Sequence, residues 1–177
     1  MGANRTIKVE QLTLEAYKPF GTFSNLINPS DDKLGAPPVE FFRDQLQIDV
    51  TPNQNWSYSC CRVEKRPLII DILEYHSSCG EVVLPLDNDI LLQVAPATAS
   101  KGDIPLDKMR VFYVPQGTAI TIKPGVWHWG PFTPNEKPAN VLINLPERTY
   151  ANDCIVVNLE EKDFISINDA FDSNTLK

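Results

Sequence analysis

Residues 69–81 read IIDILEYHSSCGE and carry the strongest indication of the fold. Side chains two residues apart in a strand share a face, so we expect Glu74 and His76 to point the same way, with Tyr75 on the opposite face. A turn at residues 77–80 would bring Glu81, at the start of the next strand, beside His76. Three side chains suited to metal or proton chemistry are therefore expected to lie close together.

The second informative stretch is residues 117–128, which reads GTAITIKPGVWH and contains the other of the only two histidines in the chain. A short strand ends in a Pro-Gly turn, and His128 follows. Taken together, the two stretches indicate a small β barrel with a polar pocket.

The composition favours one globular domain, residues 1–177, because 42% hydrophobic residues suffice for a full core at this length. Sixteen basic against 23 acidic residues, a formal charge of −7, argue against a nucleic-acid partner. No run approaches the ~18 apolar residues of a membrane span, and the first residues lack the apolar core of a signal peptide. We expect a cytoplasmic protein without membrane contact, whose partner is a small molecule or another protein.

Fifteen prolines, eight glycines and short Val/Ile/Leu runs favour a mainly β chain broken by turns. The expected strands are residues 40–43, 56–63, 68–76, 81–86, 90–95, 109–114, 119–122, 139–145 and 154–159. Their spacing is typical of a jelly roll or small barrel.

The segments between these strands carry weaker signals. We expect a short helical turn within residues 10–17, capped by Thr13, and loops at residues 28–38 and 97–107. The tail from about residue 163 is expected to be a frayed or docked helix. The four cysteines, at positions 60, 61, 79 and 154, lack Cys-x-x-Cys spacing and are expected to be mostly reduced.

Glu74, His76 and Glu81 resemble the first motif of the cupin superfamily, His-x-His followed four or five residues later by Glu, with Glu in place of the leading His. The segment Pro124-Gly125-x-x-His128 is similar to the second motif. This resemblance implies a cupin-type jelly roll, a double-stranded β-helix barrel. It also implies a divalent metal, Ni, Mn, Fe or Zn, held by Glu74, His76, Glu81 and His128. Metal-free acid–base chemistry is the alternative.

A closer resemblance is to the ureidoglycolate lyase family, formerly ureidoglycolate hydrolases, which are cupin-fold enzymes of purine and allantoin catabolism. It rests on EAYKPFG at residues 15–21, LEYH at 73–76 through LPL at 84–86, QG at 116–117 through VWH at 126–128, and DC at 153–154. The resemblance implies cleavage of ureidoglycolate, or a related small 2-hydroxy acid derivative, to glyoxylate and urea. Because cupins are often dimers, it also implies a homodimer.

Within this resemblance, His76 or His128 is the expected base, because imidazole titrates near neutral pH. Glu74 or Glu81 would orient that imidazole or act as the acid. These roles place His76, His128 and Glu74 in the catalytic set.

Binding of a carboxylate substrate is assigned to three further residues. Arg62 and Arg148 stand where the family has substrate-facing arginines, and either can hold a carboxylate through a bidentate fork. Surface ion pairing is their alternative role. Trp129 is expected in the core or in the pocket wall.

Two departures from the family pattern leave other functions open. Trp129 replaces a common second His, and residues 38–43, PVEFFR, replace an Asn-Gly turn. Both remove polar groups, which favours a ligand-binding cupin without turnover as the alternative. A metal-dependent isomerase or dioxygenase on the same barrel is the third hypothesis.

Overall fold

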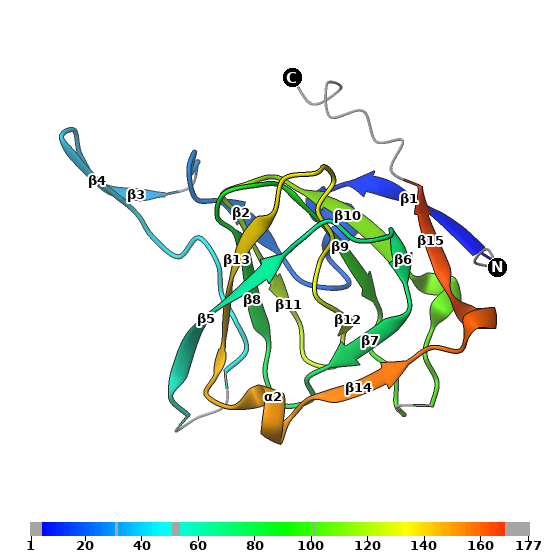
Figure 1. Ribbon diagram of the computed structural model, residues 1–177. Coiled ribbons are helices and arrows are strands. Elements are labelled where there is room, and N and C mark those ends of the chain that lie inside the picture. The colour runs from blue at the N-terminus through cyan, green and yellow to red at the C-terminus, as the bar shows by residue number, and fades with distance from the viewer. Residues whose placement is uncertain (1–4, 31, 51–53, 101, 169–177) are drawn as a thin grey trace.

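Two curled sheets face each other and enclose the interior of a barrel (Figure 1). This computed structural model describes residues 5–30, 32–50, 54–100 and 102–168. In spatial order the larger sheet contains β14 (Ile155–Asn158), β7 (Ile72–Tyr75), β12 (Trp127–His128), β9 (Ile90–Ala95), β10 (Arg110–Val114), β1 (Arg5–Gln11), β15 (Ile165–Asn168) and β6 (Ile69–Ile70). The smaller sheet contains β2 (Phe23–Asn25), β11 (Thr118–Ile122), β8 (Glu81–Pro85), β13 (Ala139–Pro146) and β5 (Trp56–Val63).

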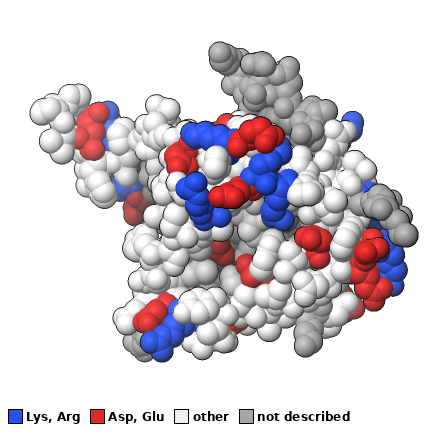
Figure 2. All heavy atoms as spheres, viewed as in Figure 1, with Lys and Arg blue, Asp and Glu red and all other residues white. Residues whose placement is uncertain are grey.

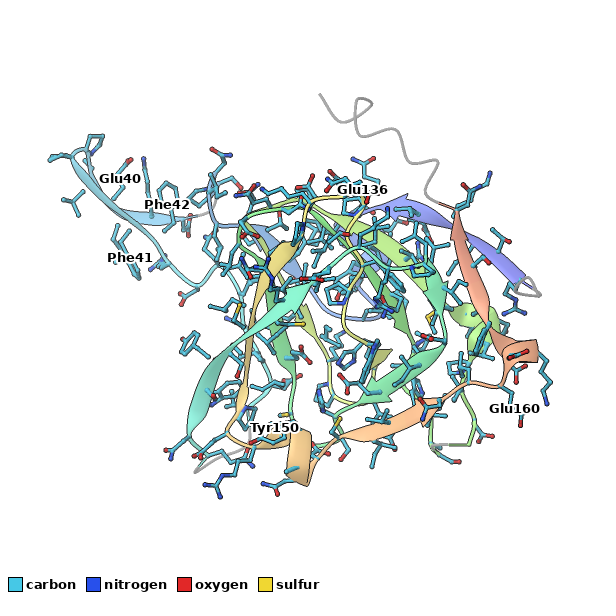
Figure 3. All side chains as sticks on the ribbon, viewed as in Figure 1. Glu40, Phe41, Phe42, Glu136, Tyr150 and Glu160 are labelled. Atoms are coloured by element: carbon cyan, nitrogen blue, oxygen red, sulfur yellow. The ribbon has the colours of Figure 1, made fainter. Side chains whose placement is uncertain are left out.

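The remaining elements are short. A separate hairpin of β3 (Lys33–Ala36) and β4 (Val39–Phe42) projects away from the barrel, with Phe41 and Phe42 on it (Figures 1 and 3). The helical elements are α1 (Leu14–Tyr17), α2 (Thr149–Asn152) and two 3-10 turns, Leu106–Lys108 and Glu161–Asp163. Among the described residues, no helix is long and apolar enough to cross a bilayer.

The inner core lies between the two sheets. The rings of Tyr17, Phe20 and Phe112 meet there, with centroids 5.3 to 6.0 Å apart. Val83 and Val141 come from the smaller sheet and pack against them. Burial of each large apolar side chain contributes about 1.5–3 kcal/mol, so this cluster anchors one sheet on the other.

A second apolar cluster covers the other face of the larger sheet. Leu73, Tyr75 and Trp127 belong to it, and the Tyr75 and Trp127 rings lie 4.6 Å apart. Because side chains alternate along β7, this packing turns Glu74 toward the barrel interior. The expected opposition of Tyr75 and Glu74 is confirmed.

The cupin-type barrel is as expected, and each predicted strand region contains strand. Residues 68–76, however, form two strands separated at Asp71, because β6 pairs with β15 while β7 pairs with β14. The loop expected at residues 28–38 is wrong at its end, where β3 pairs with β4. The described residues of the loop expected at residues 97–107 lie between the antiparallel neighbours β9 and β10 and end in the 3-10 turn that begins at Leu106.

The largest differences between the predicted and observed elements lie near the two ends of the chain. β1 was not predicted, and it pairs in parallel with both β10 and β15. The expected C-terminal helix is wrong for Ile165–Asn168, because β15 buries Ile165 and Ile167 in the outer cluster. The remainder of that prediction, residues 169–177, lies outside the described residues.

Two local predictions are confirmed. The helical turn is α1, and the Thr13 hydroxyl accepts a hydrogen bond from the Ala16 amide at 3.2 Å. All four cysteines are free thiols. A single domain for the whole of residues 1–177 stays a prediction.

Candidate functional site

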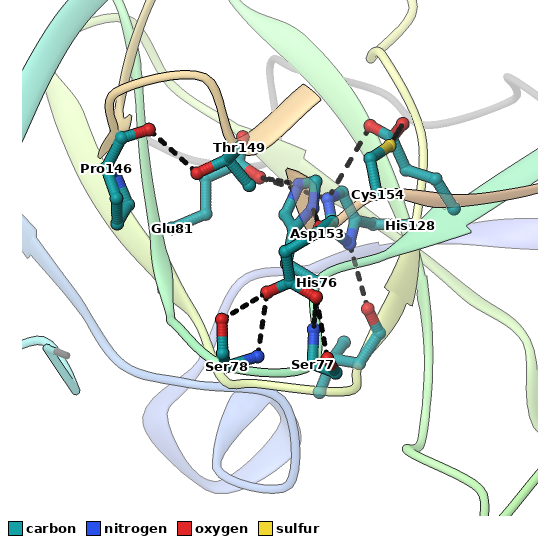
Figure 4. A network of polar contacts seen from close by, with 11 residues as sticks. His76, Ser77, Ser78, Glu81, His128, Pro146, Thr149, Asp153 and Cys154 are labelled. Carbon is teal, nitrogen blue, oxygen red and sulfur yellow. Dashed lines mark hydrogen bonds and ion pairs between the residues drawn. The ribbon is translucent and has the colours of Figure 1, made fainter. Parts of the chain in front are cut away.

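The candidate site lies inside the barrel, where strands from both sheets approach one another (Figure 4). His128 in β12 is paired with Glu74 in β7, and His76 follows directly after β7. Glu81 is the first residue of β8 in the opposite sheet. The site thus combines side chains from two sheets, and the structure brings together all four residues of the expected metal set.

The four side chains converge on one small volume. Glu81 Oε2 lies 3.0 Å from His128 Nε2 and 3.3 Å from His76 Nε2. Glu74 Oε1 lies 3.9 Å from His128 Nε2. Both histidines and Glu81 are buried, at 4–6% exposure, so these contacts are shielded from water.

Backbone carbonyls orient both imidazole rings. His76 Nδ1 lies 2.7 Å from the Asp153 carbonyl oxygen, and His128 Nδ1 lies 2.9 Å from that of Val126. Because a carbonyl only accepts hydrogen bonds, each Nδ1 carries the proton. In a neutral ring the lone pair is then on Nε2, directed at the centre of the cluster.

This arrangement requires a proton or a cation at the centre. The Nε2 lone pairs and the Glu81 carboxylate would otherwise face one another, so a proton or a metal cation must lie between them. Burial alone would raise the pKa of Glu81, but the neighbouring His128 and His76 lower it to about 2. For His128, burial opposes the charged form, but Glu81 outweighs it and raises the pKa. Without a bound ion, both shifts favour an ion pair between Glu81 and His128.

The same arrangement fits a divalent metal. Glu74, His76 and His128 each offer a ligand atom, and these atoms lie within 4.8 Å of one another. Glu81, in contact with both rings, would supply the fourth ligand of the expected set. Two imidazoles and two carboxylates suit Mn, Fe, Ni or Zn, and the backbone bonds at Nδ1 are the outer contacts that usually orient metal-bound histidines.

A cavity of about 280 Å³ opens onto the cluster. Its walls are apolar, with Val83, Leu92, Ile143 and Leu145 among the lining residues. Tyr150, on α2, also lines it and is otherwise exposed (Figure 3). A small ligand in this cavity would meet the histidines and glutamates of the cluster, and further polar residues of the lining include Ser57, Ser59 and Arg148.

The three expected substrate-binding residues are placed differently. Arg148 and Trp129 line the cavity. Arg148 is exposed and adopts a left-handed backbone with φ of 64°, a conformation that is strained for a residue with a side chain. Arg62 does not line this cavity: it lies on β5 next to Cys61, is 60% exposed and contacts Glu64 at 3.7 Å.

Arg66 was missed from the sequence, where no motif marks it. It donates a hydrogen bond to the Gly130 carbonyl at 2.8 Å and stacks over the Phe132 ring at 3.7 Å. With Arg62 it lines a neighbouring pocket that also includes Glu74 and Trp129. The face in Figure 2 shows basic and acidic side chains interspersed around a hollow, and no area of one sign dominates it.

The sequence predicted no site role for Asp153 or Cys154, which entered only through the family resemblance, the reduced thiols and the strand expected at residues 154–159. Each Asp153 carboxylate oxygen accepts bonds from the amide and hydroxyl of one serine, Ser77 or Ser78, at 2.5 to 2.9 Å. Burial alone would raise the pKa of Asp153, but these bonds lower it to about 2. Cys154 Sγ donates to Glu74 Oε2 at 3.0 Å, and burial together with that carboxylate raises the pKa of the thiol to about 12.

A two-sheet barrel with a buried cluster of two histidines and two glutamates defines a protein of the cupin class. The ureidoglycolate lyase family matches residues 4–167, so the chain belongs to this family. The ureidoglycolate lyase of Pseudomonas fluorescens (strain Pf0-1) is 30% identical over 129 residues, 70% of this chain and 75% of that protein. The ureidoglycolate lyase of Burkholderia cepacia is 29% identical over 133 residues, 72% of this chain and 73% of that protein.

Among solved structures, a dTDP sugar isomerase from Desulfovibrio desulfuricans G20 is similar, with a TM-score of 0.51 and 14% sequence identity. The match covers 80% of this chain and 87% of that one. At this identity the likeness concerns the fold alone, and it agrees with the cupin-type barrel.

Proposed function

We propose that this protein is a lyase that cleaves ureidoglycolate, or a closely related 2-hydroxy acid derivative, to glyoxylate and urea. The observation that carries the proposal is the buried cluster of His76, His128, Glu74 and Glu81 at the polar end of a small cavity. Membership in the ureidoglycolate lyase family supports the choice of substrate.

The reaction needs two proton transfers. A base takes the proton from the substrate hydroxyl, the carbon–nitrogen bond breaks as the carbonyl of glyoxylate forms, and the departing urea nitrogen receives a proton. An acid and a base with well-separated pKa values can perform both transfers.

The cluster contains groups of both kinds. Without a bound ion, His128 Nε2 holds a proton against Glu81 and is suited to protonate the leaving nitrogen. Glu74 Oε1, 3.9 Å from that nitrogen, has lone pairs suited to accept the hydroxyl proton, and His76 is the alternative base. A divalent metal held by the two histidines and the two glutamates would polarise the substrate hydroxyl or carboxylate.

The cavity also has features that suit an anionic substrate. Arg148 is among the lining residues, and a guanidinium can bind a carboxylate through two parallel hydrogen bonds; its Nε lies 3.2 Å from Glu147 Oε1, a contact that such binding would replace. The apolar part of the wall, including Val83 and Leu92, would be covered by a bound substrate, which would limit water at the reacting end. Arg62 remains a predicted carboxylate partner from the family resemblance, although it lies outside this cavity.

The test is glyoxylate release from ureidoglycolate, measured by coupling glyoxylate reduction to NADH oxidation. We expect turnover by the wild type and a loss of about 100-fold or more in Glu74→Gln, because that variant loses a candidate base. Circular dichroism would establish that the variant folds. Binding of ureidoglycolate without turnover would support a non-catalytic binding protein instead, and oxygen-dependent turnover only with added Fe(II) would support a dioxygenase.

Three expectations about the biological setting stay proposals. We propose a homodimer, which light scattering on the purified protein would test. We also propose a cytoplasmic location and a role in allantoin and purine catabolism, which fractionation and growth on allantoin as nitrogen source would test.

A further inference from the structure

We propose that Cys154 is a positioning residue whose thiol holds the Glu74 carboxylate in the orientation that the cluster requires. Cys154 Sγ donates a hydrogen bond to Glu74 Oε2 at 3.0 Å, inside the candidate cavity. The other carboxylate oxygen, Oε1, is the one that lies 3.9 Å from His128 Nε2. The inference rests on the proposed function, because it assigns Glu74 a role in that cluster.

Glu74 needs such a partner more than Glu81 does. Glu81 contacts both imidazoles, at 3.0 and 3.3 Å, so the histidines themselves hold it. Glu74 makes only the longer contact with His128, and its side chain is 19% exposed, against 7% for Glu81. The thiol contact therefore supplies the restraint that burial and the histidines supply to Glu81.

The sheet register fixes the position of the thiol. β14 is antiparallel to β7, with Ile155 opposite Tyr75 and Val156 opposite Glu74. Cys154 directly precedes this ladder and is diagonal to Glu74, within reach of a long side chain on the same face. The pairing of β14 with β7 thus places the donor on the same face as Glu74.

Asp153 gives the same segment a second positioning contact. Its carbonyl oxygen lies 2.7 Å from His76 Nδ1, and its carboxylate binds the backbone of Ser77 and Ser78, directly after His76. The dipeptide 153–154 therefore orients one histidine and one glutamate of the cluster. Such outer contacts typically change metal affinity or activity about 10–100-fold when they are removed.

The experiment compares Cys154→Ala, which removes the donor, with Cys154→Ser, which retains an O–H donor. The matched control is Cys79→Ala, which removes a buried thiol that does not line the cavity. Calorimetric titration of metal-stripped protein with Mn²⁺ is the first readout, because Mn²⁺ prefers oxygen and nitrogen ligands and has little affinity for the thiol itself. The kcat and KM for ureidoglycolate are the second, and thermal unfolding checks that each variant folds.

We expect Cys154→Ala to bind Mn²⁺ about tenfold more weakly and to lose about tenfold in kcat, with KM changed less than threefold. Cys154→Ser should stay within about threefold of the wild type in both, since its hydroxyl restores the hydrogen bond. The control should retain wild-type Mn²⁺ affinity.

Two results in folded variants would overturn the positioning role: an alanine variant that matches the wild type, or a serine variant as impaired as alanine. If the wild type turns over substrate without binding Mn²⁺, the positioning role is judged from kcat alone: it is overturned if the alanine variant matches the wild type or if the serine variant is as impaired as alanine. A wild type that neither binds Mn²⁺ nor turns over would overturn the proposed function, and the positioning role with it. Failure of the function is therefore seen in the wild type, and failure of the positioning role in the variants.

Discussion

The barrel interior has two unlike halves within the same pair of sheets. One half is filled by the rings of Tyr17, Phe20 and Phe112, and each is no more than 2% exposed. The other half holds the charged cluster around Glu81 and the open part of the cavity. Val83 belongs to the apolar core and also lines the cavity, so the two halves meet at a shared wall.

The apolar half of the interior stabilises the fold, and the polar half holds the groups proposed to perform the chemistry. Apolar burial stabilises the fold in proportion to the area removed from water. Buried carboxylates and imidazoles lower stability unless each finds a partner. Glu81 contacts both imidazoles, the Nδ1 atoms of the two rings bond backbone carbonyls, and Glu74 accepts a hydrogen bond from Cys154. Substitutions in the apolar half should therefore act on folding, and substitutions in the polar half on turnover and metal binding.

The largest effect is expected for His128→Ala in the polar half. Loss of this imidazole removes a candidate acid and a metal ligand, so kcat should fall about 100-fold to 10,000-fold. Glyoxylate release measures this loss, with circular dichroism as the control for folding. A variant that folds and retains more than a tenth of wild-type kcat would contradict the assignment of chemistry to this half.

The next effect is expected for Phe112→Ala in the apolar half. The truncation leaves a cavity against Tyr17 and Phe20, so the free energy of unfolding should fall by about 3–5 kcal/mol. Urea denaturation measures it. At temperatures where the variant stays folded, kcat should remain within about threefold of the wild type, since acid–base geometry is untouched. A loss of activity as great as that of His128→Ala would show that the halves are not separable.

The next prediction concerns the amount of metal bound by the polar half and its effect on stability. Mass spectrometry on protein purified without added metal should find a divalent ion in the wild type and in Phe112→Ala, and little in His76→Ala, which lacks one ligand. Mn²⁺ at 100 times its Kd should add about 2.7 kcal/mol to the stability of the wild type. Equal metal content in wild type and His76→Ala would place any bound ion outside the cluster.

The smallest effect is expected at the edge of the polar half, in Asp153→Asn. The pKa of Asp153 is lowered from 3.8 to about 2, so its carboxylate stabilises the fold above pH 4 and loses that contribution as the pH falls toward 2. The group is partly exposed, so solvent screening limits the effect at neutral pH to about 1 kcal/mol or less. Urea denaturation from pH 2.5 to 7 should show the two proteins converging at low pH; a constant difference would contradict this.

Much of the fold was predictable because strand periodicity and turn residues are local signals. The alternation in LEYH correctly separated Tyr75 from Glu74, and Thr13 marked the start of α1. β1 and β15 were not predicted, because they pair with each other in parallel and are separated by most of the chain. A parallel pair of this kind has no hairpin turn between its strands that the sequence could show. The break at Asp71 likewise follows from a change of partner strand.

For the candidate site, residue types and local spacing were enough to predict the available chemistry: two histidines, each beside a turn, Glu74 at strand spacing from His76, and Glu81 across the turn that follows it. Which atoms of these side chains contact one another depends on the packing of the two sheets. The packing of β8 against β7 and β12 joins Glu81 to both rings, and the register of β14 on β7 adds Asp153 and Cys154. It also leaves Arg62 outside the cavity and Arg148 at its lining. The physical reason is that residue type and spacing set what a side chain can do, whereas distances between segments far apart in sequence depend on strand pairing and sheet packing.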